Sequence, residues 1–165
     1  YKMAADAGDV DSAIKFASLI ENSNNNESLF YYKMAADEGN VEAMYKYAKK
    51  LMDNKDNLEE ACHYLKSAAD NDNVDAMNLL AFMLDKGEGI EINKKEALNL
   101  YKTAADKGNI DALKSYSSKL RNGDGIEADV QKANYYLKLI DQNNTIEAIK
   151  EKLWFVFIIK TFRPY

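Results

Sequence analysis

Apolar and small residues recur along the chain with the spacing of a helix face. In the stretch 27–37 these positions are Ser28, Tyr31, Tyr32, Ala35 and Ala36. Intervals of three and four residues place such side chains on one face of an α-helix, whereas a strand would alternate at every second residue. The same spacing predicts further helices over about 58–70, 94–107 and 130–141.

A second helix is expected after each of these, beyond a tight turn. Its first position is held by a residue whose side-chain oxygen can accept a free backbone N–H, and an acidic residue follows two positions later. These cap positions are Asp9, Asn40, Asn73, Asn109 and Thr145. Glycine precedes the cap at Gly8, Gly39 and Gly108 and permits the left-handed turn that ends the first helix, whereas Asp72 stands there in another copy.

The helix pairs are copies of one sequence unit. YKMAADEGN from Tyr32 and YKTAADKGN from Tyr101 are nearly identical, and related segments begin at Tyr1, Leu65 and Leu137. Starts separated by roughly 31 to 36 residues are typical of solenoids built from helical hairpins. We therefore expect an all-α fold, an α/α superhelical solenoid of antiparallel helix pairs. It would comprise about four to five units, the first of them truncated.

The repeated frame resembles the Sel1-like repeat family, a relative of the tetratricopeptide repeat. The residues that carry the resemblance in one unit are Gly87, Gly89, Ala97, Tyr101, Ala104, Ala105, Gly108 and Ala112. It covers nearly the whole chain, to about residue 150. The resemblance implies an α/α superhelix that serves as a scaffold or adaptor for other proteins and has no catalytic residues of its own.

Composition and charge argue against several other classes of function. The chain has 165 residues and a net charge of −5, whereas proteins that bind nucleic acid usually carry clustered Lys and Arg. Cys62 and His63 are the only residues of their kind and point about 100° apart on a helix, so neither a disulfide nor a zinc site is expected. No apolar run is long enough to span a membrane. We expect no enzymatic activity and no cofactor.

The C-terminal end departs from the repeat. The pattern assigns residues 1–152 to the repeat array and residues 153–165 to an apolar segment that contains LWFVFII. Exposed apolar patches usually mark a contact, so residues 153–159 are expected to pack on a following repeat or on a second copy of the chain; an abnormal fragment end is the alternative. The disulfide-bearing extracellular members of the family are not matched. A cytoplasmic location is therefore favoured, and a secretory lumen stays open.

One position on the first helices is lysine in four copies: Lys33, Lys66, Lys102 and Lys138. Stacked helices lie roughly 10 Å apart, so these lysines are expected to line one side of the superhelix. They would attract an acidic peptide along its inner face. The alternative is local pairing with the aspartate four residues later, which would leave an ordinary solvated surface.

The position three residues before each lysine varies from copy to copy. It holds Phe30, His63, Asn99 and Tyr135. A position that does not repeat is not fixed by the packing of the array, so specificity for a partner could reside there. The sequence thus predicts a non-catalytic scaffold or adaptor that binds a partner protein or peptide on the concave face, and the lysines favour an acidic partner. A regulatory or structural arm of a larger enzyme or signalling protein is the alternative.

Overall fold

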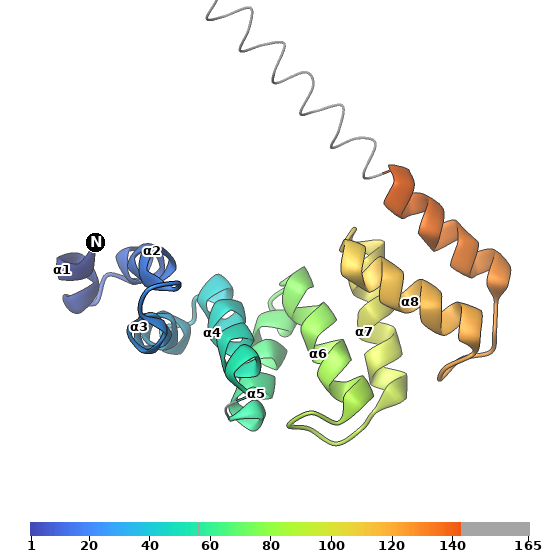
Figure 1. The fold of residues 1–165 in the computed structure, drawn as a ribbon, viewed down its shortest axis with the longest axis horizontal. Coiled ribbons are helices and arrows are strands. Elements are labelled where there is room, and N and C mark those ends of the chain that lie inside the picture. Colours follow the sequence, from blue (N-terminus) through green and yellow to red (C-terminus); the bar gives the residue numbers. More distant parts are fainter. Residues whose placement is uncertain (56, 143–165) are drawn as a thin grey trace, which may run out of the picture.

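The computed structural model describes residues 1–55 and 57–142, and every regular element within these ranges is an α-helix. The helices are α1 (Lys2–Asp6), α2 (Val10–Ile20), α3 (Asn25–Asp37), α4 (Val41–Asn54), α5 (Leu58–Asp70), α6 (Val74–Lys86), α7 (Lys94–Asp106) and α8 (Ile110–Asn122). Residues 130–142 are helical as well. The helices stack in chain order into an elongated array (Figure 1). The predicted all-α solenoid is confirmed.

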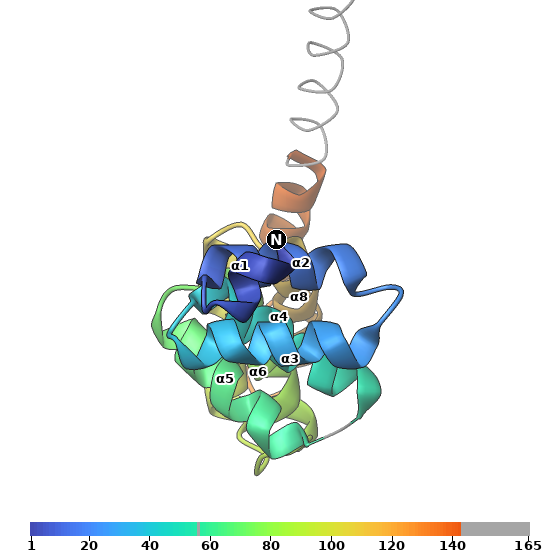
Figure 2. The ribbon, with the colours of Figure 1, turned by 90° about the vertical axis from the view of Figure 1, so that its left-hand side faces the viewer.

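The helices alternate between two roles in successive hairpins. We number the hairpins unit 1 (α1–α2), unit 2 (α3–α4), unit 3 (α5–α6) and unit 4 (α7–α8), and residues 130–142 begin unit 5. The second helices α2, α4 and α6 pack against the first helix of their own unit and more extensively against the first helix of the next. Viewed along the array, the helices of successive units point in different directions, so the stack twists into a superhelix (Figure 2).

Alanines at equivalent positions let the helix backbones approach closely. Ala35, Ala68 and Ala104 have no exposed surface, and the residues three positions before them are the core side chains Tyr32, Leu65 and Tyr101. Interiors packed at this density leave no room for extra methylene groups. The recurring Ala-Ala-Asp sequence is therefore a requirement of packing between helices.

Asparagine caps begin first helices as well as second helices. At the second helices, Asn40 and Asn109 accept the backbone N–H of the residue three positions later, as predicted. At the first helices, Asn24, Asn57 and Asn93 do the same, and each also donates its side-chain amide to the glutamate at that position. The asparagine-rich links thus also cap the first helix of the next unit, a role that was not predicted from the sequence. The predicted cap Thr145 and the predicted segment 153–165 lie outside the described residues.

The glycines of the KGEGIEIN link have two different tasks. Gly87 ends α6 in the left-handed conformation, with φ of 73°. Gly89 lies against the start of α5, where an added Cβ atom would come within 2.5 Å of the Leu58 backbone. The first glycine therefore serves a turn, and the second permits a close approach of two backbone segments.

The turn between the two helices of a unit also needs a left-handed residue. Gly8, Gly39 and Gly108 adopt φ of 91°, 87° and 91°, and Asp72 adopts φ of 66° at the equivalent position. A residue with a Cβ atom pays a conformational cost there that glycine avoids. The turn of unit 3 therefore carries backbone strain that the equivalent turns of the other units do not.

We expect Asp72→Gly to raise the free energy of unfolding by roughly 0.5 to 1 kcal/mol, because it relieves this strain. The matched change Gly39→Ala should lower it by about 1 kcal/mol. A Cβ atom at Gly39 meets nothing within 4 Å, so that cost is purely one of backbone conformation. Urea unfolding followed by circular dichroism measures both. A loss of stability in Asp72→Gly would show that the exposed Lys107–Asp72 ion pair, 3.0 Å long, outweighs the strain.

Candidate interaction surfaces

The four lysines of the predicted row lie at one position on four successive first helices, but their surroundings differ. Lys33 is half-buried, and Lys66, Lys102 and Lys138 are exposed. Lys102 forms the predicted local ion pair with Asp106, 2.6 Å away and one turn later. Lys66 forms no hydrogen bond or ion pair with another described residue. The row is therefore not a uniform line of free cations.

Lys33 pairs across the boundary between units 2 and 3 and not along its own helix. Its ammonium donates to Glu60 and lies 3.4 Å from the Tyr64 hydroxyl, both on α5. It also stacks over the rings of Tyr47 and Tyr64, with centroids at 5.0 and 5.3 Å. The hydrogen bond from Lys33 lowers the pKa of Glu60. Lys33 thus stabilises the junction between two units.

A tyrosine–aspartate contact recurs on the same side of the array. The hydroxyls of Tyr31, Tyr64 and Tyr136 donate to Asp6, Asp37 and Asp106, the aspartates of the preceding Ala-Ala-Asp sequences. Each of these tyrosines also meets an aromatic ring of the preceding second helix edge to face; the partners are Phe16, Tyr47 and Tyr116. At the junction of units 3 and 4, Leu80 and Leu100 occupy the two ring positions. The recurrence of tyrosine two residues before the row lysine, at positions 31, 64 and 136, was the available sequence signal, and it was not used.

The four variable positions are all exposed on the first helices. Phe30 is 63% exposed and Tyr135 is 59% exposed, and His63 and Asn99 are exposed as well. The rings of Phe30, His63 and Tyr135 stand edge to face against the junction tyrosine that follows each in sequence, at 5.2, 5.5 and 5.5 Å between centroids. We call Phe30, His63, Asn99 and Tyr135 the variable row. The contacts between the described helices leave the variable row exposed.

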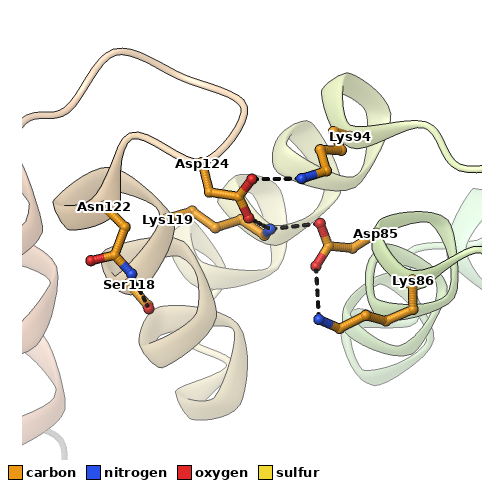
Figure 3. Close-up of polar contacts among 7 residues, drawn as sticks. All are labelled: Asp85, Lys86, Lys94, Ser118, Lys119, Asn122 and Asp124. Atoms are coloured by element: carbon orange, nitrogen blue, oxygen red, sulfur yellow. Dashed lines mark hydrogen bonds and ion pairs between the residues drawn. The ribbon is translucent and has the colours of Figure 1, made fainter.

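A second feature is a polar groove of about 420 Å³ between the second helices α6 and α8. Its inner part holds an ion cluster (Figure 3). The Lys119 ammonium lies 2.6 Å from an Asp85 oxygen and 2.9 Å from an Asp124 oxygen, and Lys94 reaches Asp124 at 2.8 Å. The side chains of Lys119 and Asp85 are only 10% and 9% exposed. Sequence analysis did not single out any of these residues.

Lys119 and Asp124 stay charged over a wide pH range. Burial opposes the charged form of Lys119, but the hydrogen bonds to Asp85 and Asp124 outweigh it and raise the pKa of Lys119. The hydrogen bonds from Lys94 and Lys119 lower the pKa of Asp124 to about 2. Burial, together with the charge of Asp85, raises the pKa of Tyr101 beside the cluster to about 12. The cluster is therefore a network of fixed charges and not an acid–base site poised near neutral pH.

Related clusters occur at alternate junctions. Between units 1 and 2, Tyr32 donates to Glu21 at 3.0 Å, and Lys50 lies 4.0 Å from the same carboxylate. Between units 2 and 3, the three equivalent positions are the apolar residues Met52, Leu65 and Met83. The lysines at the equivalent positions 50 and 119 were the available sequence signal. The unit between them has Met83 at this position, so the lysine did not stand out as a repeated residue.

Other site types find no support in the described part of the chain. No group of three His, Cys, Asp or Glu residues there could hold a metal ion. None of the helices searched has the length and apolarity needed to cross a bilayer. Cys62 is buried, and burial raises the pKa of its thiol to about 11.

Comparison with known proteins identifies the repeat. The sequence model of the Sel1 repeat matches residues 19–40, 41–73, 74–109 and 120–139, which is more than half of the chain. No curated protein sequence matches the chain.

Solved structures share the fold. A Sel1 repeat protein from Oxalobacter formigenes superposes with a TM-score of 0.78 at 22% identity, over 85% of this chain and 61% of its own. The protein c5321, a protective antigen of uropathogenic Escherichia coli strains with an SLR fold, gives 0.79 at 20% identity, over 86% of this chain and 32% of its own. A putative Sel1 repeat protein from Klebsiella pneumoniae gives 0.64 at 20% identity, over 84% and 70%. The chain thus spans less than two thirds of the first two proteins.

We expect Lys119→Met to lower the free energy of unfolding by about 2 kcal/mol, because it removes the main counter-charge of the buried Asp85 carboxylate. The double change Asp85→Met with Lys119→Met reproduces the methionines of the preceding junction. It should recover most of the loss, since a buried ion pair adds little net stability over a packed apolar pair. A double-mutant cycle in urea measures the coupling. Additive losses in the double variant would mean that the two residues act independently.

Stability should also depend on Asp124 in a pH-dependent manner. Its pKa is about 2 in the fold against an ordinary 3.8, so its stabilisation is fully present above 3.8 and is lost as the pH falls through about 2. Asp124→Asn should therefore be less stable than the parent at neutral pH, and the difference should shrink below about pH 4. Glu91→Gln, an exposed loop change, is the control. A difference for Asp124→Asn that stays constant with pH would contradict the ion-pair assignment.

Proposed function

Because the chain belongs to the Sel1 repeat family, we propose that it is a non-catalytic scaffold that binds a segment of a partner protein along the variable row of its first helices. Sel1 repeat proteins generally mediate protein–protein interaction. The observation that carries the proposal is the exposure of Phe30 and Tyr135, two large rings that the array does not need for its own packing. The proposal places this row on the concave face of the superhelix.

Exposed aromatic rings support a binding role in two ways. Tyr, Trp and Phe are enriched at protein interfaces and among the residues whose truncation costs most affinity. In addition, Phe30 and Tyr135 are held edge-on against Tyr31 and Tyr136, so little conformational freedom remains to be lost on binding. His63 and Asn99 lie between them in the array and offer hydrogen-bonding groups. An extended segment along the variable row would therefore contact units 2, 3, 4 and 5.

The neighbouring lysines favour an acidic segment. Lys66 has no partner among the described residues, and Lys102 has only an exposed ion pair, which contributes little. Attraction to an acidic partner would act mainly on the association rate and would weaken with salt. Lys33 should contribute least, because it is held by Glu60.

Photo-crosslinking tests the location of the partner. A photoreactive phenylalanine analogue at position 30 or 135 should capture the same partner protein, whereas the analogue at position 19 should not. Leu19 is a matched control, since it is 69% exposed but lies on a second helix. The double variant Phe30→Ala with Tyr135→Ala should then bind the purified partner at least tenfold more weakly, as expected when two interface rings are lost. Calorimetry measures this affinity. Equal capture at position 19, or unchanged affinity of the double variant, would refute the proposed surface.

A further inference from the structure

The groove between α6 and α8 lies on the other side of the first-helix layer from the variable row. On α7, Tyr101 lines the groove, whereas Asn99 belongs to the variable row. At about 100° per residue these two side chains point roughly 160° apart around the helix. A segment seated in the groove would therefore not occupy the variable row.

The groove offers hydrogen-bond donors whose present partners are weak. Lys86 lies 3.9 Å from Asp85, too far for a hydrogen bond, and Lys114 meets Asp111 at 3.2 Å on the open surface. The Asn122 amide has only a 3.5 Å contact with Ser118. The carboxylates of Asp85 and Asp124, in contrast, already accept from Lys119 and Lys94 (Figure 3). The groove thus presents donors that are held only by long or exposed contacts, while both of its carboxylates are engaged.

One wall of the groove is apolar. Phe82 lines it and is 37% exposed, among otherwise polar side chains. The volume of about 420 Å³ is near the lower end of the range for ligand sites and corresponds to about one turn of a helix with its side chains. These dimensions suit a few residues of extended chain.

We propose that the groove between α6 and α8 binds an extended acidic segment of a second protein, with a carboxylate on Lys86 and Lys114 and a neighbouring apolar side chain on Phe82. Three lysines against two aspartates line the groove, on a chain whose net charge is −5. This local reversal of sign orients an acidic segment toward the groove. A groove occupied independently of the variable row makes the array an adaptor able to hold two partners at once.

The test uses a fluorescein-labelled nonapeptide in which glutamate alternates with leucine, and the same peptide with glutamine in place of glutamate. Fluorescence anisotropy at low salt measures binding to the folded chain. The glutamate peptide should bind at least tenfold more tightly than the glutamine peptide. The groove reversal, Lys86→Glu with Lys114→Glu, should weaken binding of the glutamate peptide at least tenfold. Lys15→Glu with Lys49→Glu, which makes the same charge change at exposed positions of second helices outside the groove and the variable row, should alter its affinity less than twofold.

Three outcomes would overturn the proposal: no binding of the glutamate peptide to the parent chain, no weakening by the groove reversal, or equal weakening by both charge reversals. Phe82→Ala leaves the charges unchanged and should still weaken binding severalfold; no effect would remove the apolar subsite. Amide chemical shifts locate the peptide without any variant. Perturbations at Ser115, Ser118 and Asn122 support the groove, whereas perturbations confined to the variable row reject it. Neither result depends on the crosslinking test of the first-helix surface.

Discussion

The second helices α2, α4 and α6 pack mainly against the first helix of the following unit, so the first three hairpins do not complete their own cores. Alanines without exposed surface, such as Ala35, Ala68 and Ala104, set how closely those helices approach. A closer or wider spacing would create overlap or voids, and both destabilise a packed interior. Because the spacing is fixed, equivalent side chains of successive units recur at regular positions. Rows on the first helices and grooves between the second helices are consequences of that regularity.

Polar clusters then distinguish one junction from another. Between units 2 and 3, Lys33 and Glu60 pair on the first-helix side, while Met52 and Met83 are the equivalents of the ion-cluster residues. Between units 3 and 4 the arrangement reverses, with Leu80 and Leu100 on one side and Lys119 and Asp85 on the other. Buried ion pairs contribute little net stability, but an unpaired buried charge is costly. The clusters therefore penalise a unit packed against the wrong neighbour more than they strengthen the correct pairing.

The sequence was sufficient for the helices, the caps of the second helices and the stacking order, because these depend on spacing within some ten residues. It also identified the variable row, since exposure follows from position on a helix. It did not predict the partner of Lys33, because Glu60 is brought near by the geometry of stacking. The rule of pairing along one helix holds for Lys102 and Asp106 but not for Lys33. The ion cluster at Lys119 was missed for a related reason: its equivalents differ in chemistry from unit to unit, so the repeat did not reveal it.

The units can be compared with one another as independent solutions to the same packing problem. Where they agree, as in the alanine pair and the cap, packing or chain geometry dictates the residue. Where they differ on the inside, as between Met83 and Lys119, the neighbouring residues differ to match. Where they differ on the outside, as between Phe30 and Asn99, no described contact within the array accounts for the difference. Such positions can change with little loss of stability, so we propose that binding specificity resides at exposed positions of the first-helix surface and at the rim of the α6–α8 groove.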